Sequence, residues 1–456
     1  MSSNPVARAE PVEPPRALGF WSAAALVVGH TIGVGIFLTP AQLVGALASP
    51  AATLGLLIAT GGLVLAGALT FGELASRYPQ AGGLYVYLRR AWGERTAFLY
   101  GWLCLLVMDP GVTAALVLGL TPYLVALSPA LAGHERAVGV ALIWALALAN
   151  MAGLRPSSRF LNGLTAVKAI ALAGFVAAAF GIGRGSWAHF SPFWERRAGA
   201  PPPTEALALA VIGAFYSFGG FWEASRVAGE VRNPSRTLPR ALAAGVLAVT
   251  AAYVVTTLAF IYLVPPSEAA TPSDFARRAG TALLGPSGPP ALAAVVILSV
   301  LASAMALLLM APRLYLTMSL DGLFPDALAK LDPRTGSPTR ATALLAAIAT
   351  LYVLSGTFPQ IVALFLCPTL LFVALAAAAL FPIRRTETAG ASFRAPGYPA
   401  TPALFVLLLL AVVGLTAVAR PIPALAGFAL VLLGLPAHRG LEARRRQREM
   451  LKGDRR

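Results

Sequence analysis

Two glycine-rich stretches interrupt long apolar segments: GHTIGVGIFLTP from Gly29 to Pro40, and FYSFGGFW from Phe215 to Trp222. In the first stretch three glycines fall within seven residues, with Gly33 and Gly35 at its middle. The second contains the adjacent pair Gly219 and Gly220. Each glycine weakens a helix by about 1 kcal/mol relative to alanine. The sequence therefore predicts that neither segment is a continuous helix.

The composition around these stretches is that of a membrane protein. Of the 456 residues, 57% are hydrophobic and 12% are charged, and the mean hydropathy is +0.74. In soluble domains roughly a quarter of the residues are charged. Apolar stretches of about 20 residues, enough to span a hydrocarbon layer about 30 Å thick, recur along nearly the whole chain. We therefore expect an all-α polytopic membrane protein with about twelve transmembrane helices.

Breaks at Pro, Gly and charged residues divide the chain into spans and tails. We expect an N-terminal tail at 1–17, five spans at 18–183, five more at 205–381, two further spans at 401–437 and a basic tail at 438–456. The two glycine-rich stretches fall in the first and the sixth span, so each opens a set of five. Gly-interrupted segments in corresponding positions of two halves indicate a transporter built from inverted repeats. The expected spans are 18–45, 51–76, 96–124, 136–154, 160–183, 205–231, 239–264, 290–318, 339–356, 359–381, 401–419 and 421–437.

The distribution of basic residues predicts the orientation. The net charge is +16, but the 35 Lys and Arg residues lie between apolar segments rather than in one patch interleaved with aromatics, so we expect no nucleic-acid partner. If the N-terminus is cytoplasmic, the large majority of these cations lie on the inner side. The positive-inside rule then places both termini in the cytoplasm, and we expect a multi-pass protein of the cell inner (plasma) membrane. The first residues mix Pro, Glu and Arg and do not resemble a cleavable signal.

A helix that unwinds at mid-membrane exposes backbone groups. Free N–H groups remain at the start of one half-helix and free C=O groups at the end of the other. The N–H end suits a carboxylate, and the C=O end suits an ammonium. A zwitterionic amino acid carries both groups. Glycine in membrane helices also serves close packing, but two clusters at matching positions favour a substrate site.

Three stretches, in order along the chain, carry a family resemblance. The first is Gly29 to Pro40. The second is ELASRYPQAGGLYVYLRRAWG from Glu73 to Gly93, and the third is GEVRNPSRTLPRA from Gly229 to Ala241. They resemble the unwound first helix, the loop after the second helix and the connection from the sixth to the seventh helix of the amino acid/polyamine/organocation transporter superfamily, most nearly its L-type amino acid transporter branch. The resemblance implies a five-plus-five inverted repeat with discontinuous helices 1 and 6, two extra helices, and alternating access to a central site.

The resemblance also implies which residues contact the substrate. By position they are Thr31, Gly33, Val34 and Gly35 in the first helix, and Tyr216, Ser217, Phe218 and Gly219 in the sixth. Tyr216 stands where the family often keeps an aromatic gate over the substrate. The family frequently has Ser between the two glycines of the first helix. Here Val34 takes its place, which removes a hydroxyl partner for the carboxylate but leaves the backbone N–H.

Lys168 is a cation in the fifth span, about 12 Å along a helix that starts near Phe160. An ionisable residue at this depth is costly enough to suggest a function, although a lysine can also snorkel to the surface. Its position resembles that of the lysine that occupies the region of a sodium site in sodium-independent members of the family. Ser299 and Ser303 of the eighth span are candidate partners. We expect sodium-independent transport, by exchange or proton symport.

Asp109 and His30 are two further ionisable residues at membrane depth. Asp109 in the third span either lines the substrate cavity and favours cationic side chains, or accepts a proton, or caps the helix that restarts at Pro110. His30 lies beside the first break. We expect a neutral imidazole bonded to freed backbone, and its reference pKa of about 6.5 leaves a proton relay open.

Glutamates at the ends of two spans are candidate gate residues. Glu73 and Glu230 lie at expected cytoplasmic helix ends, near arginines such as Arg77 and Arg226. We expect them to form ion pairs that close the inner side, the alternative being solvated charges at helix ends. Glu223 lies deeper in the sixth span and must find a partner there or be protonated.

Other classes of protein find little support in the sequence. None of the four histidines clusters with Asp, Glu or Cys at metal-ligand spacing, so we expect neither an enzyme nor a metal or other cofactor. A Gly-rich phosphate loop of an ATP-driven pump is absent. Cys104 and Cys367 both fall inside apolar segments, which argues against a disulfide framework.

Two alternatives to amino acid transport stay open. One is a transporter for polyamines or other organic cations, which the superfamily also contains. The other is a nutrient sensor on a transporter scaffold, although the tails are too short for a signalling domain. The loop from Leu127 to Arg136 has no cysteine, so we expect no covalently linked partner subunit. The expected partners are an amino acid substrate and the lipid bilayer.

Overall fold

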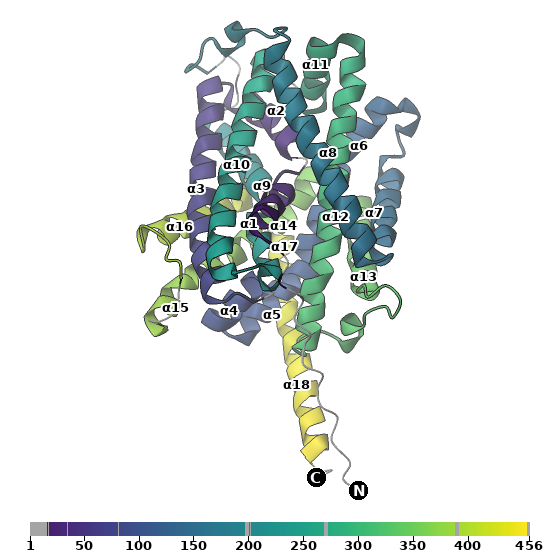
Figure 1. The fold of residues 1–456 in the computed structure, drawn as a ribbon, viewed down its shortest axis with the longest axis vertical. Helices are drawn as coiled ribbons and strands as arrows, with labels where there is room; N and C mark the ends of the chain where they lie inside the picture. The colour runs from purple at the N-terminus through teal and green to yellow at the C-terminus, as the bar shows by residue number, and fades with distance from the viewer. Residues whose placement is uncertain are drawn as a thin grey trace.

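The computed structural model is a bundle of long helices (Figure 1). It describes residues 16, 18–33, 35–80, 82–196, 200, 202–268, 272–387 and 392–453. Within these ranges β-type pairing is limited to one isolated bridge, between Leu18 and Val231. The all-α fold expected from the sequence is confirmed.

The first half of the membrane region contains the first broken helix. The half-helices α1 and α2 meet at an angle of 49°, so the predicted interruption is present. Helices α5 and α6 join through a π-helical turn, η1 (Cys104–Met108), into one 34-residue span. The helices are α1 (Phe20–Thr31), α2 (Gly35–Leu47), α3 (Pro50–Arg77), α4 (Leu84–Trp92), α5 (Glu94–Leu103), α6 (Asp109–Leu127), α7 (Glu135–Met151) and α8 (Leu154–Gly181).

The second half contains the second break, at the predicted place. Helix α9 ends at Phe218, and Gly220 has a φ of +95°, a left-handed conformation that side chains rarely adopt. The chain continues as the 3-10 helix η4 (Phe221–Glu230). The α-helices are α9 (Pro203–Phe218), α10 (Pro234–Leu263), α11 (Pro272–Leu284), α12 (Gly288–Leu320), α13 (Thr339–Ser355) and α14 (Phe358–Ala378).

Helix α11 was not expected from the sequence, which predicted a loop between the spans ending at 264 and starting at 290. It packs against α12. The close approach depends on glycine, because a side chain begun at Gly288 would lie 1.7 Å from the carbonyl oxygen of Gly280. An amphipathic helix of only 13 residues lacks the long apolar run by which the spans were recognised.

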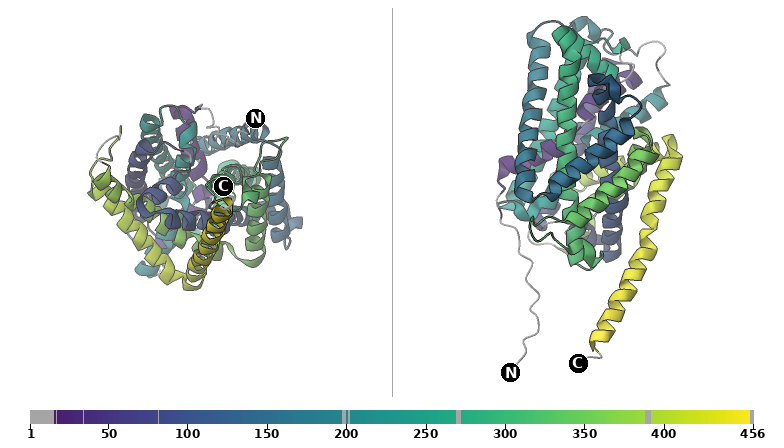
Figure 2. Two further views of the ribbon diagram at one scale, coloured as in Figure 1. Left: turned by 90° about the horizontal axis from the view of Figure 1, so that it is seen from below. Right: turned by 90° about the vertical axis from the view of Figure 1, so that its right-hand side faces the viewer.

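The C-terminal part adds α15 (Leu380–Thr386), α16 (Ala400–Ala419), α17 (Pro421–Leu432) and α18 (Gly434–Gly453). The sequence predicted a basic tail from residue 438, whereas the helix α18 continues through it to Gly453 and projects from the bundle (Figure 2). Short 3-10 turns lie in the connections: η2 (Pro129–Leu131), η3 (Trp187–Phe190), η5 (Pro266–Glu268), η6 (Gly285–Ser287) and η7 (Asp326–Ala329).

Counting the membrane spans gives a number near the predicted twelve. Among the described residues, nine helices are long and apolar enough to cross a membrane, or ten if α1 and α2 form one span. Helices α7 and α13, which the sequence counts as spans, have 17 residues each, or about 25 Å at 1.5 Å per residue. The polytopic architecture is therefore confirmed, and the count of twelve stays a prediction.

The first four spans of the first set contact their counterparts in the second set. Helix α3 packs against α10, α6 against α12, α7 against α13, α2 against α9, and α1 against η4. In the expected numbering each pair joins span n to span n + 5. Such pairing is what an inverted repeat predicts, and it puts the two broken helices side by side at the centre.

The two ends of the bundle differ in the segments that they carry. Helices α4, α15 and α18 lie at one end, which we call the inner end, and α11 lies at the other (Figure 1). The sequence assigned the loops that contain α4 and α15 and the C-terminal tail to the cytoplasmic side, and the loop that contains α11 to the opposite side. The structure thus sorts the predicted inside and outside segments to opposite ends.

Candidate functional site

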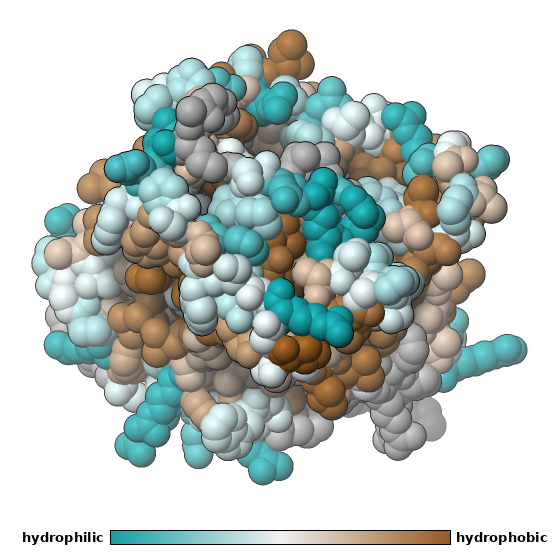
Figure 3. Space-filling view, turned by 90° about the horizontal axis from the view of Figure 1, so that it is seen from above, coloured by the Kyte–Doolittle hydropathy of each residue, from teal (hydrophilic) through white to brown (hydrophobic). Residues whose placement is uncertain are grey.

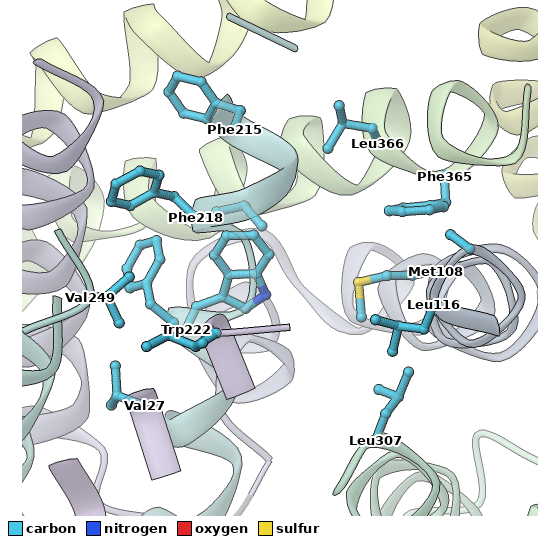
Figure 4. Packing of buried hydrophobic residues seen from close by; sticks show 14 of the residues in the cluster. Val27, Met108, Leu116, Phe215, Phe218, Trp222, Val249, Leu307, Phe365 and Leu366 are labelled. Atoms are coloured by element: carbon cyan, nitrogen blue, oxygen red, sulfur yellow. The ribbon is translucent and has the colours of Figure 1, made fainter. Parts of the chain in front are cut away.

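A central cavity lies where the two broken helices meet. Its volume is about 100 Å³, several times the roughly 10–15 Å³ that holds one water molecule. Figure 4 shows Trp222 on one side, with Met108, Leu116 and Leu307 across from it. Most of the predicted substrate contacts line the cavity: Thr31, Gly33, Gly35, Tyr216, Ser217 and Gly219.

The first break determines which backbone groups are free. The N–H of Gly33 donates to the carbonyl of Thr31, 2.9 Å away, and the hydroxyl of Thr31 donates to the carbonyl of Val27 at 2.8 Å. Val34 lies outside the described residues. The first N–H groups of a helix have no intrahelical partner, so those of α2, which begins at Gly35, are the donors available to a carboxylate.

Gly35 allows the two broken helices to touch. A side chain begun at Gly35 would lie 2.5 Å from the Ser217 hydroxyl oxygen and 3.0 Å from that of Tyr253. One turn further along α2, the hydroxyls of Thr39 and Ser217 are hydrogen-bonded. The close contact between α2 and α9 therefore requires glycine at this position.

The sixth helix presents only part of its predicted contacts to the cavity. Tyr216, Ser217 and Gly219 line it, but Phe218 does not. The Phe218 ring stacks on Tyr253 with ring centroids 5.0 Å apart. Residues two apart on a helix point in nearly opposite directions, so Tyr216 and Phe218 cannot both face the substrate. The predicted contact of Phe218 is corrected accordingly.

Lys168 binds the end of α1. Its ammonium donates to the carbonyls of Gly29, at 3.1 Å, and of Ile32, and to the hydroxyl of Ser303 at 3.3 Å. The residue is 5% exposed, so the ammonium does not snorkel to the surface. Ser299, the other serine expected nearby, has no hydrogen-bond partner for its hydroxyl.

Asp109 lies at the cavity wall directly after the π-helical turn η1. π-bulges occur frequently at functional sites, because the extra residue reorients those that follow. One carboxylate oxygen, Oδ2, accepts a hydrogen bond from the Tyr315 hydroxyl at 2.7 Å. The other, Oδ1, lies 3.8 Å from Nη2 of Arg226 and has no hydrogen-bond donor. No side chain caps the start of α6, so the capping interpretation of Asp109 is not supported.

Glu223 has the ionic partner that its burial requires. Its carboxylate lies 2.5 Å from Nε of Arg226, one turn along η4. The guanidinium also reaches the hydroxyl of Tyr100, at 3.4 Å, and the sulfur of Cys104, at 3.5 Å. Arg226 therefore ties η4 to the π-helical turn in the third span. The place of Arg226 in the sequence suggested a pair with Glu230, but Arg226 pairs with Glu223 instead.

His30 sits between the two breaks. It lines the cavity, and its ring carbon Cδ2 lies 3.5 Å from the point where a side chain on Gly220 would begin. The ring thus occupies the space that the second break leaves open. Both interpretations of His30, a neutral partner of the backbone and a proton relay, stay predictions.

Glu73 forms the most buried ion pair at the inner end. Its carboxylate accepts hydrogen bonds from Arg77 at 2.9 Å, from Arg384, and from the N–H of Ala395 at 2.7 Å. The Glu73 side chain is fully buried. The expected pair with Arg77 is therefore present, and Arg384 extends it to the segment after α14.

Replacing Glu73 with glutamine should destabilise the protein. The change leaves the guanidinium groups of Arg77 and Arg384 without their buried counter-charge, and removing one partner of such a pair costs about 3–5 kcal/mol. Thermal unfolding of the purified protein in detergent should show a lower Tm. Glu195→Gln, in the exposed loop before α9, serves as the control. An unchanged Tm for Glu73→Gln would mean that the network contributes nothing to stability.

Two partly exposed interactions also join elements at the inner end. Glu230 of η4 pairs with Arg313 of α12 at 3.1 Å. Arg89 of α4 pairs with Asp321 at 2.9 Å, and the Tyr85 hydroxyl donates to the same carboxylate at 2.6 Å. Burial and this hydrogen bond raise the pKa of Tyr85, which keeps its hydroxyl protonated as a donor. These contacts join η4, α4 and α12 at the inner end.

A second cavity, the outer vestibule, lies toward the opposite end. It has a volume of about 410 Å³ and is lined by residues that include Gln42, Tyr216, Phe358 and Arg420. Tyr216 lines both cavities, and its ring packs edge-on against Phe358 with centroids 5.6 Å apart. Seen from this end, the surface is hollowed between polar and apolar side chains (Figure 3). Tyr216 thus separates the central cavity from the vestibule.

Several lining residues were not predicted from the sequence, among them Trp222, Phe365 and Thr369. Tyr315, which binds Asp109, was also missed. A period of 3.6 residues within an apolar span could have grouped Thr369 with Phe365, but no signal in an all-apolar helix says which face is inward. Within the described residues, no group of three His, Cys, Asp or Glu side chains could hold a metal ion.

Two broken helices that meet at a central cavity, in a polytopic bundle with paired halves, define the architecture of a secondary transporter. The profile of the family described as "Amino acid permease" matches residues 18–433. The chain therefore belongs to the amino acid permease family.

Three relatives show how far the similarity extends. The serine/threonine exchanger SteT of Bacillus subtilis is 26% identical over 94% of this chain and 98% of its own length. The human cystine/glutamate transporter is 27% identical over 94% of this chain and 86% of its own. An uncharacterized transporter of Mycobacterium bovis is 32% identical over 74% and 73%. The resemblance to the L-type branch is confirmed.

Proposed function

We propose that this chain is a secondary active transporter that moves amino acids across the cytoplasmic membrane by alternating access. The observation that carries the proposal is the central cavity, because residues of both helix breaks line it. The free N–H groups at the start of α2 suit the substrate carboxylate. At the end of α9 the carbonyl of Ser217 accepts a hydrogen bond from the Tyr253 hydroxyl, and the carbonyl of Tyr216, next to Gly219, suits the substrate ammonium.

The structure favours α9 over α1 as the partner of the substrate ammonium. The carbonyls of Gly29 and Ile32 at the end of α1 already accept hydrogen bonds from Lys168. At the end of α9, a side chain begun at Gly219 would lie 3.3 Å from the carbonyl oxygen of Tyr216. A glycine there leaves that carbonyl accessible from the cavity.

Sodium independence is the finer part of the proposal. A sodium ion bound at the end of α1 would need the oxygen atoms that Lys168 contacts. A second positive charge a few ångströms from an ammonium is unfavourable in a medium of low dielectric constant. The transport cycle then runs by exchange or by proton symport, and the two are distinguished by whether external acid accelerates uptake.

Alternating access requires one barrier on each side of the substrate. On the inner side the barrier consists of the ion pairs of Glu73, Glu230 and Arg89. On the other side it is the thin layer formed by Tyr216 and Phe358. The thick inner barrier and the vestibule beyond Tyr216 correspond to an outward-facing, occluded arrangement.

Uptake of radiolabelled amino acids into proteoliposomes tests the proposal directly. Accumulation or exchange that depends on the purified protein supports transport. Binding without flux would support the sensor alternative, and flux of polyamines without amino acids would support the organic cation alternative. We expect a stand-alone carrier with both termini in the cytoplasm.

Replacing Tyr216 with alanine should impair the outer gate. The change removes the ring that separates the two cavities, so we expect an apparent KM higher by roughly tenfold, the equivalent of about 1.4 kcal/mol. Tyr216→Phe keeps the ring and its packing against Phe358, and should stay close to the unchanged protein. Equal damage from both changes would assign the role to the hydroxyl and reject a steric gate. Initial uptake rates over a range of substrate concentrations give the comparison.

A further inference from the structure

Two carboxylates line the central cavity, and a single guanidinium lies beside them. Asp109 and Glu223 are 0% and 4% exposed and both belong to the cavity wall. Arg226 lies 2.5 Å from Glu223 and 3.8 Å from Asp109, but it is not among the described residues that line the cavity. The cavity is therefore lined by the two carboxylates, whereas the guanidinium of Arg226 that they share lies outside its lining.

The hydrogen bonds of this cluster are incomplete on the side of the cavity. Tyr315 donates to Oδ2 of Asp109, whereas Oδ1 has no hydrogen-bond donor. Neither oxygen of Glu223 has a donor with hydrogen-bond geometry. A buried carboxylate oxygen without a donor is costly. A cationic group that enters the cavity would supply both the missing donors and the missing charge.

The other ionisable groups near the cavity do not fill this role. The Lys168 ammonium is held by the carbonyls of Gly29 and Ile32 and is not among the described lining residues. His30 lines the cavity beside Gly220. Cys104 and Tyr100 contact Arg226 rather than the carboxylates. When both carboxylates are ionised, the cluster with Arg226 carries one negative charge that a cationic ligand would neutralise.

We propose that the cavity selects amino acids with positively charged side chains, with Asp109 as the acceptor for the side-chain ammonium or guanidinium and Glu223 as the second acceptor. This inference rests on the proposed function, in which the α-carboxylate and α-ammonium bind at the two breaks. Asp109 begins α6 and Glu223 lies in η4, and Arg226 lies beside both carboxylates. A cationic side chain that extends into the cavity from the breaks would therefore find both acceptors close together.

Aromatic and apolar side chains of the cavity fit the same ligand. Trp222 and Phe365 line it, and the face of an aromatic ring attracts a guanidinium or ammonium. Met108 and Leu307 offer apolar surface to the methylene groups of such a side chain. A carboxylate side chain would instead add a third negative charge to a buried site, which is unfavourable.

The test compares arginine with citrulline, which has nearly the same shape but no side-chain charge. Proteoliposomes that contain the purified protein are loaded with unlabelled amino acids. Arginine or citrulline is then added outside, and each is tested as a competitor for the uptake of a labelled amino acid. A hydrogen bond to a charged group contributes about 1.5–3 kcal/mol, so arginine should compete at roughly ten- to a hundredfold lower concentration than citrulline. Asp109→Asn keeps the size and the bond from Tyr315, and should bring the two compounds to within about threefold.

The controls separate this inference from the proposed function. Asp332→Asn makes the same change in the loop between η7 and α13, where the carboxylate accepts N–H groups of Arg334 and Thr335, and should preserve the arginine preference. If the Asp109→Asn protein does not fold, Glu223→Gln is the substitute test, and it should also reduce the preference for arginine over citrulline. Uptake of neutral or acidic amino acids with no advantage for arginine over citrulline overturns the inference but leaves transport standing. A loss of acid stimulation in Asp109→Asn, with the arginine preference unchanged, assigns Asp109 to a proton and also overturns it.

Discussion

Replacing Gly35 with alanine should nearly abolish uptake by a carrier that still inserts into the membrane. The added methyl group would lie 2.5 Å from the Ser217 hydroxyl oxygen, so α2 and α9 would have to separate. Overpacking of this kind costs about 1–3 kcal/mol, which corresponds to roughly ten- to a hundredfold in binding. The first N–H groups of α2 would also shift from the position that the carboxylate needs. A larger side chain, as in Gly35→Leu, should remove binding entirely.

A matched control for this change exists in α3. A side chain on Gly62 would meet no atom within 4 Å, so Gly62→Ala adds the same methyl group without a collision. It should leave uptake unchanged. Substrate binding is measured by the thermal shift that a saturating amino acid produces, and folding by size-exclusion chromatography. A folded Gly35→Ala protein with normal uptake would reject the assignment of this break to the substrate carboxylate.

Replacing Lys168 with alanine should give an inserted carrier with a much lower rate. The ammonium joins the end of α1 to Ser303 of α12. Its loss leaves buried carbonyls without donors, at about 1–3 kcal/mol each. The position of α1 relative to α12 would then no longer be fixed, and we expect uptake to fall by at least roughly tenfold. Lys330→Ala, at an exposed position outside the bundle, should have no effect.

The role of Lys168 also predicts the ionic requirement of the unchanged protein. Uptake measured in choline medium free of sodium should match that in sodium medium, because the ammonium occupies the oxygen atoms that a sodium ion would bind. A strict requirement for sodium would reject this role. Retained uptake that rises at acid pH would favour proton symport over exchange.

The sequence predicted the membrane architecture because each relevant signal is local. Glycines disfavour a continuous helix whatever the tertiary structure around them. Both breaks occur where Gly33 to Gly35 and Gly219 to Gly220 predicted them. The position of Lys168 within an apolar span likewise predicted a buried cation. Its contacts with Gly29 and Ser303 could be expected from the family resemblance but not from the spacing of residues.

The predictions for individual side chains were weaker where the contact depends on the direction in which the side chain points. Phe218 belongs to the same short stretch as Tyr216 but points into the core. The pairing of Arg226 with Glu223 and Asp109, rather than with Glu230, depends on how η4 winds after the break. The π-helical turn before Asp109 has no sequence signature that we recognise. These features arise from tertiary packing, which an apolar pattern does not encode.

The bridge between Leu18 and Val231 has a mechanical consequence. The N–H of Leu18 donates to the carbonyl of Glu230, and the N–H of Arg232 donates to the carbonyl of Leu18, at 2.9 and 2.8 Å. These bonds use main-chain atoms alone, so the side chains of this segment can vary without releasing it. The half-helices α1 and η4 are thereby coupled at the inner end of the bundle. A movement that opens the inner end must therefore move α1 and η4 together, as one rigid unit.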